Sequence, residues 1–319
     1  MQSSNSNTVT EVFLLGFQNL HIWTIICFLL LLNIYCVTIC GNLLIIVVVS
    51  SSRSLHSPMY FFLTQLSTLD IMLTSTIVPN MLRVVLYKGR TLSFTECLTQ
   101  FYFFAASESL ECLLLTVMSY DRYQAICNPL RYTSIMDFTS CKKVVLLCWL
   151  IMLTIVFTLS ITMRSLWFCG PNIIDHFFCD FDPIVELSCS DTFFMKIERM
   201  VVAVPLVICP FLVILVSYIY IIITIANISS VTGRQKTFST CSSHLSVVCL
   251  YFGSIISIYL IPYTVKAKKI LSLFYTVVSP LLNPLIYSLN NRDIKTAVSK
   301  LFNKMGAIDL VCMTKHLNI

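Results

Sequence analysis

Long stretches without a charged residue dominate this sequence. No Asp, Glu, Lys or Arg occurs in residues 12–52, 144–163, 200–233, 237–265 or 270–291. Each range holds about 20 apolar residues, which as a helix would cross a hydrocarbon layer about 30 Å thick. The whole chain is 57% hydrophobic and only 11% charged, whereas soluble domains carry roughly a quarter charged residues. These stretches therefore predict membrane spans.

Two further apolar segments are interrupted by acids and bring the number of predicted spans to seven. Residues 58–82 contain Asp70, and residues 97–119 contain Glu108 and Glu111. Backbone groups in lipid must be hydrogen-bonded within the spans, so we expect helices. We therefore predict an all-α membrane protein, a seven-transmembrane helix bundle.

Three regions are expected along the chain. Residues 1–22 form an extracellular N-terminus, and residues 306–319 form a cytoplasmic tail. Residues 23–305 form the seven-span domain, including a short amphipathic helix at about 291–305. In that helix apolar side chains recur at helical spacing between lysines, which is typical of a helix lying on the inner membrane surface.

The distribution of basic residues indicates the orientation. The first twenty residues contain no Lys or Arg, so they do not resemble a cleavable signal peptide. With the N-terminus outside, the predicted cytoplasmic side holds twelve of the 21 Lys and Arg residues, a modest bias of the expected sign. An odd number of spans then places the C-terminus in the cytoplasm, so we expect a multi-pass protein of the plasma membrane.

Four of the fifteen cysteines fall on the predicted outer side: Cys97, Cys169, Cys179 and Cys189. An oxidising compartment allows them to form disulfides. Four cysteines permit three pairings, and their positions alone do not choose between these.

Acids within predicted spans are costly unless they are paired, hydrated or protonated. Glu111 lies eleven residues before Arg122, roughly 16 Å along the helix, which is the depth expected for Asp70. We favour an internal polar site that holds a sodium ion or a proton and is shared by Asp70, Glu111 and Asn42. The alternative is a static polar network that joins helices.

Glu108 lies one turn further out, where a ligand cavity would open. It could pair with a cationic ligand, or it could be a protonated carboxylic acid that is hydrogen-bonded inside the bundle.

The triplet Asp121-Arg122-Tyr123 ends the third predicted span. An Arg in this position can pair with the neighbouring acid in one state and release it in another. The simpler alternative is an Arg that extends to the membrane surface. In the last span, Asn283-Pro284 places a polar side chain beside a break in the helical hydrogen bonding.

Several motifs occur in the order that odorant receptors show. They are LHSPMYFFL at 55–63, MSYDRY at 118–123, KTFSTCSSHL at 236–245 and PLLNPLIYS at 280–288. Together with Gly41-Asn42 and Ser217-Tyr218, they cover about residues 8–305. The chain resembles the odorant receptors, a family of rhodopsin-like G-protein-coupled receptors.

This resemblance implies disulfides between Cys97 and Cys179 and between Cys169 and Cys189. It also implies a cavity for a small, mostly apolar odorant in the outer half of the bundle. The expected lining residues are Phe104, Ala105, Glu108, Ser109, Val202, Leu206, Ile255, Ile256, Tyr259 and Thr276, with Phe252 at the floor. A Tyr259 hydroxyl in an apolar cavity suits volatiles that carry one polar group.

The resemblance further implies coupling to a heterotrimeric G protein of the stimulatory olfactory type, which raises cyclic AMP. Ligand binding would favour a state in which the sixth span swings outward beside Arg122. The expected coupling residues are Asp121, Arg122, Tyr123, Tyr218, Asn283, Pro284 and Tyr287. Membrane lipid is a further expected partner and nucleic acid is not. No cofactor is expected other than the sodium ion considered at Asp70 and Glu111.

Two other functions fit parts of the sequence. One is a G-protein-coupled receptor for a small molecule that is not an odorant. The other is a membrane transporter, which would be supported by paired broken helices in inverted repeats or by a charged pore, and neither is visible. An enzyme is not expected, because the spans contain no credible catalytic Ser-His pair, no His-Glu-x-x-His motif and no metal cluster.

Overall fold

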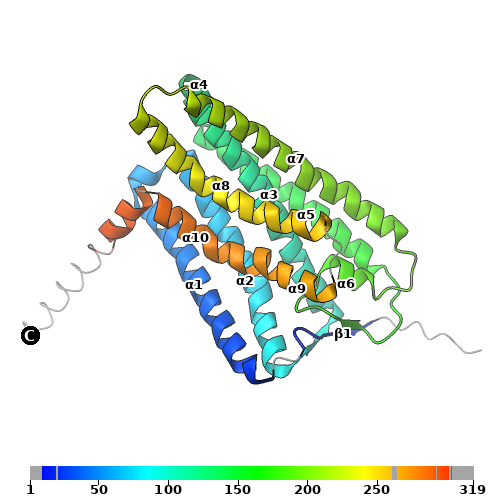
Figure 1. The fold of residues 1–319 in the computed structure, drawn as a ribbon. Coiled ribbons are helices and arrows are strands. Elements are labelled where there is room, and N and C mark those ends of the chain that lie inside the picture. Colours follow the sequence, from blue (N-terminus) through cyan, green and yellow to red (C-terminus); the bar gives the residue numbers. More distant parts are fainter. Residues whose placement is uncertain (1–8, 19–20, 261–263, 292, 302, 304–319) are drawn as a thin grey trace, which may run out of the picture.

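The computed structural model describes residues 9–18, 21–260, 264–291, 293–301 and 303. It is a helix bundle with a small sheet at one end (Figure 1). The long helices are α1 (Thr24–Ser51), α2 (Pro58–Tyr87), α3 (Phe94–Cys127), α5 (Phe138–Arg164), α7 (Phe193–Ala226) and α8 (Val231–Leu260). The chain then continues through α9 (Val265–Leu273), the π-helical turn η3 (Phe274–Val278) and α10 (Ser279–Asn290).

Six helical stretches among the described residues are long and apolar enough to cross a membrane. They are α1, α2, α3, α5, α7 and the continuous stretch Ala267–Ser288. Large apolar side chains on these helices face outward, for example Leu29, Leu146 and Val201, as expected where lipid replaces water. The chain is therefore a multi-pass membrane protein. The remaining predicted span, the sixth in chain order, falls on α8, whose apolar part, Cys241–Ser257, is shorter.

The ends of two helices follow local signals in the sequence. Pro58 occupies the first turn of α2, where its missing N–H costs no hydrogen bond. At the start of α3, the Ser93 hydroxyl accepts from the Glu96 backbone N–H at 3.1 Å, and the Glu96 carboxylate accepts from the Ser93 N–H at 2.8 Å. This capping box fixes where the third span begins.

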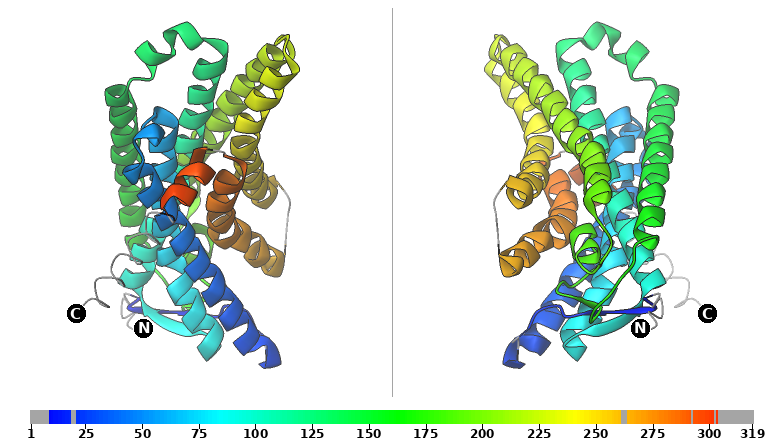
Figure 2. Two further views of the ribbon diagram at one scale, coloured as in Figure 1. Left: turned by 90° about the vertical axis from the view of Figure 1, so that its left-hand side faces the viewer. Right: turned by 90° about the vertical axis from the view of Figure 1, so that its right-hand side faces the viewer.

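The sheet corrects the expectation of an entirely helical chain. Its strands are β1 (Glu11–Leu14), β2 (Arg90–Ser93) and β3 (Ile173–Ile174). β1 is the central strand, antiparallel to β2 and parallel to β3. Val12 and Leu14 of β1 are buried, so burial of alternate side chains accounts for a strand here. We call this part of the molecule the sheet end; Figure 2 shows the connection between α7 and α8 at the opposite end.

Helix α3 occupies the centre of the bundle, packing against α2, α5, α7 and α8. α1 lies against α2 and α10. A Cβ atom on Gly41 of α1 would lie only 3.2 Å from the Pro284 side chain of α10, so the absence of a side chain permits this close approach. The short α4 (Pro129–Ile135) follows α3 at the opposite end (Figure 1).

Candidate functional site

A cavity of about 180 Å³ lies inside the bundle near the sheet end. Helices α3, α5, α7 and α8 form most of its wall, and the segment between α5 and α7 and Tyr275 of η3 contribute the rest. The lining is predominantly apolar. It consists of Phe101, Phe104, Ala105, Glu108, Ser109, Cys112, Val156, Leu159, Asp180, Phe181, Asp182, Arg199, Val202, Ala203, Leu206, Val207, Tyr251, Ile255 and Tyr275.

The structure brings together many of the residues that the sequence predicted for a ligand cavity. Those that line it are Phe104, Ala105, Glu108, Ser109, Val202, Leu206 and Ile255. Phe252, Ile256 and Thr276 are not in the lining, which corrects their predicted place. Phe252 is buried against Phe211 (ring centroids 5.6 Å apart), and the Thr276 hydroxyl donates to the Ser272 carbonyl oxygen. The side chain of Tyr259 lies outside the described part of the chain.

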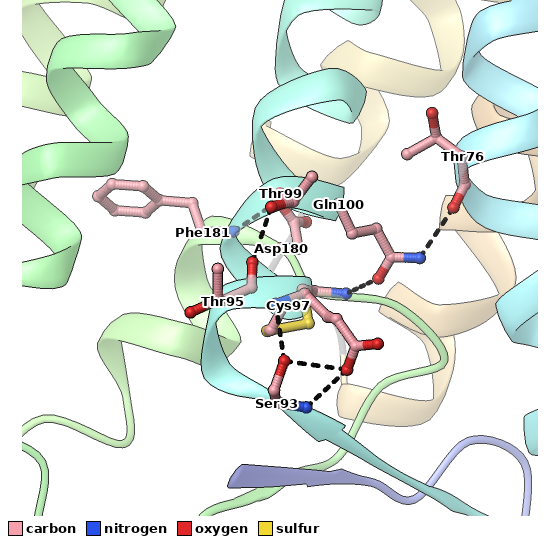
Figure 3. Close-up of a disulfide and its surroundings, with 10 residues drawn as sticks. Thr76, Ser93, Thr95, Cys97, Thr99, Gln100, Asp180 and Phe181 are labelled. Atoms are coloured by element: carbon pink, nitrogen blue, oxygen red, sulfur yellow. Dashed lines mark hydrogen bonds between the residues drawn. A yellow bond between two sulfur atoms is a disulfide. The ribbon is translucent and has the colours of Figure 1, made fainter. Parts of the chain in front are cut away.

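A segment between α5 and α7 reaches the cavity because it is attached to α3. Both expected disulfides are present, Cys97–Cys179 and Cys169–Cys189. Beside the first, the Gln100 side chain accepts from the Cys179 N–H and donates to the Thr76 carbonyl oxygen, each at 3.0 Å (Figure 3). The chain immediately after Cys179 is therefore held against the first turns of α3.

This attachment places three residues in the cavity wall that the sequence did not indicate: Asp180, Phe181 and Asp182. Asp180 caps the short helix α6 (Phe181–Val185), accepting from the Phe181 N–H at 2.7 Å. Burial raises the pKa of Asp180 to about 6, although this hydrogen bond opposes the rise. Arg199 of α7 pairs with Asp182 and lies 5.0 Å from the centre of the Phe181 ring. The sequence could have indicated their place in the wall, because they directly follow Cys179, which was expected to form a disulfide with Cys97 of α3.

Glu108 is the acid that projects from α3 at the cavity. Both of its carboxylate oxygens are buried and have no hydrogen-bond partner among the described residues. The Tyr251 hydroxyl donates to the Glu108 backbone carbonyl at 2.6 Å, not to the carboxylate. The apolar cavity therefore contains a polar group whose hydrogen-bonding capacity is unused.

A second, more polar cavity of about 450 Å³ adjoins the first, and we call it the vestibule. It shares Asp180, Asp182, Arg199 and Tyr275 with the first cavity. Its other lining residues are Ile173, Asp175, His176, Pro183, Glu186, Leu187, Lys268 and Ser272. The two cavities therefore meet at the segment that follows the Cys97–Cys179 disulfide.

The wall of the vestibule is connected to the N-terminal segment through Lys269. Its ammonium group donates to the Gly16 carbonyl oxygen at 2.8 Å and to the Asp175 carboxylate at 2.5 Å. The adjacent His176 is buried, and this burial, together with the charge of Lys269, lowers the pKa of His176 to about 3. His176 is therefore neutral at physiological pH.

Deeper in the bundle, Asp70 of α2 and Glu111 of α3 meet. The Asn283 amide nitrogen of α10 donates to both Asp70 oxygens, at 3.0 and 3.2 Å, and to Glu111 at 3.3 Å. Asn42 was predicted to share this site, but its amide donates to the Thr38 and Pro280 carbonyl oxygens. The bridging residue is therefore Asn283, because α10 and not α1 supplies the amide between the two acids.

At the end opposite the sheet, Arg122 pairs with Asp121 at 3.0 Å. The Tyr132 hydroxyl of α4 donates to the same carboxylate at 2.8 Å. No role was predicted for Tyr132 from the sequence. Tyr123 packs against Tyr220 of α7, with ring centroids 5.9 Å apart.

Helices α7 and α8 meet through another polar pair near this end. The Tyr218 hydroxyl lies 2.7 Å from Nδ1 of His244. His244 belongs to the motif at 236–245, but no function was predicted for it. The Tyr287 hydroxyl of α10 is buried without a partner among the described residues, and Pro284 lies inside α10. The predicted coupling residues thus lie on α3, α7 and α10.

Comparisons with known proteins give a consistent result over nearly the whole chain. A family model described as olfactory receptor matches residues 31–305. Olfactory receptor 11L1 from Homo sapiens is 46% identical over 311 residues, which are 97% of each chain. Olfactory receptor 1M1 from Mus musculus is 43% identical over 307 residues, 95% of this chain and 98% of the relative. Olfactory receptor 10A7 from Homo sapiens is 44% identical over 303 residues, 94% of this chain and 96% of the relative.

Proposed function

The chain belongs to the olfactory receptor family, and from that premise we propose that an odorant in the cavity controls a G-protein site at the other end of α3. The observation that carries this proposal is the arrangement along α3. Glu108 lines the cavity near one end, and the Asp121–Arg122 ion pair lies near the other. One central helix therefore contacts both sites. The olfactory receptor family is not a family of enzymes.

We propose that the sheet end faces outside the plasma membrane and the opposite end faces the cytoplasm. Two disulfides at the sheet end support this orientation, since disulfides persist in oxidising surroundings. We assign α8 as the sixth span in chain order, which completes a set of seven, because it has 30 residues and packs against α7 and α10. An odd number of spans then places the two termini on opposite sides.

We also propose that the helical residues 293–301 form the predicted amphipathic helix on the inner membrane surface. Ile294 and Ala297 of this stretch are buried. The Tyr60 hydroxyl of α2 donates to the Asp293 carboxylate at 3.1 Å. The stretch is therefore attached to the bundle on one face, and its lysines remain available to lipid headgroups.

The ligand is proposed to be small and mostly apolar, because aromatic and aliphatic side chains make up most of the cavity wall. An odorant activates the receptor only if it binds the active state more tightly than the resting state. Val202 and Leu206 lie on α7, and Ile255 lies on α8. A ligand in contact with these residues can therefore change the position of the two helices relative to each other.

In the active state, α8 moves outward and Arg122 leaves Asp121 to meet the G protein. The partner is proposed to be of the stimulatory olfactory type, so that cyclic AMP rises. Tyr218 and Tyr287 lie near this path, and the Tyr287 hydroxyl is free to accept a new partner within the described part of the chain. Rearrangement of such a packed interface between two discrete states is a common switching device.

Asp70 and Glu111 are proposed to hold a proton or a sodium ion between them. Two buried carboxylates cannot both remain charged without compensation. Asn283 supplies N–H donors to both, and its own Oδ1 is buried without a partner among the described residues. A set of carboxylate and amide oxygens is suited to a hard cation.

The alternative ligand is a small molecule that is not an odorant, acting on the same fold. A broad odorant panel tested in cells with a cyclic-AMP reporter distinguishes the two. Membership of the olfactory receptor family argues against the transporter alternative.

The experiment uses four receptors at matched surface expression: wild type, Arg122→Ala, Val202→Phe and Val201→Phe. Wild type is expected to respond to at least one odorant, and Arg122→Ala to none. Val202→Phe fills part of the cavity and should weaken the response. Its neighbour Val201 is 67% exposed on the outer face of α7, so Val201→Phe should respond normally. A full response by Arg122→Ala would contradict the coupling mechanism, and equal responses by the two valine variants would contradict the cavity.

A further inference from the structure

The Glu108 carboxylate needs a partner that the described residues do not provide. Its two oxygens are buried and unpaired. Two donors in the cavity wall are already engaged: the Tyr251 hydroxyl with the Glu108 backbone carbonyl, and the Cys112 thiol with the Leu206 carbonyl at 2.9 Å. An ionised carboxylate without donors is strongly disfavoured in an apolar environment. The cavity therefore favours a ligand that brings N–H donors and positive charge.

The charged side chains around the cavity also favour a ligand with positive charge. Asp180 enters the wall from the segment after Cys179, and its charge repels that of Glu108. Among the described lining residues the basic side chain is Arg199, which is paired with Asp182 and lies over the Phe181 ring. The positive charge of Arg199 is thus paired with Asp182, and the acids Glu108 and Asp180 remain in the wall.

The vestibule extends this acidic character toward the surface. Its lining holds four carboxylates, on Asp175, Asp180, Asp182 and Glu186. Lys269 pairs with Asp175 and Arg199 pairs with Asp182, which leaves Asp180 and Glu186 against Lys268. Residues shared by the two cavities connect the vestibule with the space beside Glu108. A cleft with an excess of one charge raises the local concentration of ligands of opposite charge.

We propose that the cavity selects a small amine with an apolar body, and that Glu108 binds its ammonium group. This inference rests on the proposed function and specifies its ligand class. The apolar body would contact side chains such as Phe104, Leu206 and Ile255. An ammonium group supplies several donors and a compensating charge in one small group. A neutral odorant with a carbonyl group would instead require Glu108 to be protonated and to donate.

The test compares three ligands of equal chain length, hexylamine, hexyl alcohol and hexanal, in the cyclic-AMP assay. A parallel pair, cyclohexylamine and cyclohexanol, varies the shape of the apolar body. Wild type should respond to an amine at a concentration at least about tenfold lower than to the matched alcohol or aldehyde, as expected for a buried charge-assisted hydrogen bond.

Glu108→Gln keeps the shape of the side chain and removes its charge, so it should raise the half-maximal amine concentration by about tenfold or more. The half-maximal concentration of any active alcohol should change by less than about threefold, within the effect of an ordinary neutral contact. The matched control is Glu11→Gln, which neutralises an exposed carboxylate on β1 outside the cavity lining and should leave both values unchanged. If Glu108→Gln fails to reach the surface, Glu108→Asp replaces it and should retain amine preference with reduced potency.

The inference is wrong if alcohols or hexanal activate wild type as strongly as the matched amine. It is also wrong if Glu108→Gln leaves amine potency unchanged, or if Glu108→Asp loses the preference for amines. Activation by neutral odorants without activation by any amine would overturn the ligand class and leave the proposed function intact. The absence of any Arg122-dependent response to the amines and to the broad panel would contradict both.

Discussion

Replacing Asp121 with Asn is expected to raise signalling in the absence of odorant. The Asp121 carboxylate is 1% exposed, and Arg122 lies 3.0 Å from it. The Tyr132 hydroxyl donates to the same carboxylate at 2.8 Å. These contacts hold Arg122 in the arrangement that the structure shows. If Arg122 must leave Asp121 to meet the G protein, weakening the pair favours the active state.

The expected size follows from the burial of the pair. A close ion pair with one member buried and the other partly exposed contributes about 2 kcal/mol, which is about a 30-fold change in the equilibrium. A resting receptor that is active about 1% of the time would then be active roughly a quarter of the time. Tyr132→Phe removes only the neutral donor, worth about 1 kcal/mol, so basal activity should rise about fivefold.

The assay is basal cyclic AMP per receptor at the cell surface, with no odorant added. Tyr120→Phe is the matched control, because Tyr120 lies on the same helix and is 40% exposed. We expect Asp121→Asn to exceed Tyr132→Phe, and Tyr120→Phe to equal wild type. The double variant of Asp121 and Tyr132 should match Asp121→Asn alone, because Tyr132 acts through that carboxylate. Basal signalling in Asp121→Asn equal to wild type would refute the role of the ion pair.

Three further perturbations test other parts of the structure. Cys97→Ser and Cys179→Ser should each lower the thermal stability of the purified receptor, by about 2–5 kcal/mol, and the double variant should be no worse; unequal single losses would mean that the two are not partners. On acidification from about pH 7 to about pH 5, the fold loses about 2 kcal/mol of stability through His176, because its pKa of about 3 lies below the unfolded value of 6.5. Over the same range the fold gains about 1 kcal/mol through Asp180, because its pKa of about 6 lies above the unfolded value of 3.8. Asp180→Asn should therefore lose about 2 kcal/mol on acidification and His176→Asn should gain about 1 kcal/mol in a thermal unfolding assay, and identical pH profiles would disprove both assignments. Asn283→Ala removes the amide that bridges the two buried acids and should lower thermal stability by about 2 kcal/mol or more; an unchanged melting temperature would show that the bridge is dispensable.

The spans were predictable because the absence of charge over long runs is a strong signal, but their boundaries were not. The first charge-free run begins at residue 12, whereas α1 begins at Thr24. Within such a run, four residues do not show whether the chain is a strand or a helix. β1 exists because of partners at residues 90–93 and 173–174, and nothing near residue 12 indicates them.

The ligand cavity was predictable to the extent that helical spacing orients side chains. Ala105, Glu108 and Ser109 lie on one side of α3, and all three line the cavity. Asp180 was missed because its position depends on how the segment after Cys179 folds over α3. Asn283 was expected in coupling and not between the acids, because the rotation of α10, which follows the π-helical turn η3, decides where its amide points.

The position of β1 at the centre of the sheet has a consequence for biosynthesis. The strand is made first, but its neighbour β3 at Ile173–Ile174 follows much later, and Lys269, which binds the Gly16 carbonyl, is separated from it by 253 residues. Contacts over such sequence distances form slowly. The edge of β1 that faces β3 and the Gly16 carbonyl therefore lack their partners until long after β1 and β2 have been made. The sheet is therefore complete only after the chain as far as Ile174 has been made, and the link from Gly16 to Lys269 forms only after nearly the whole bundle has been made.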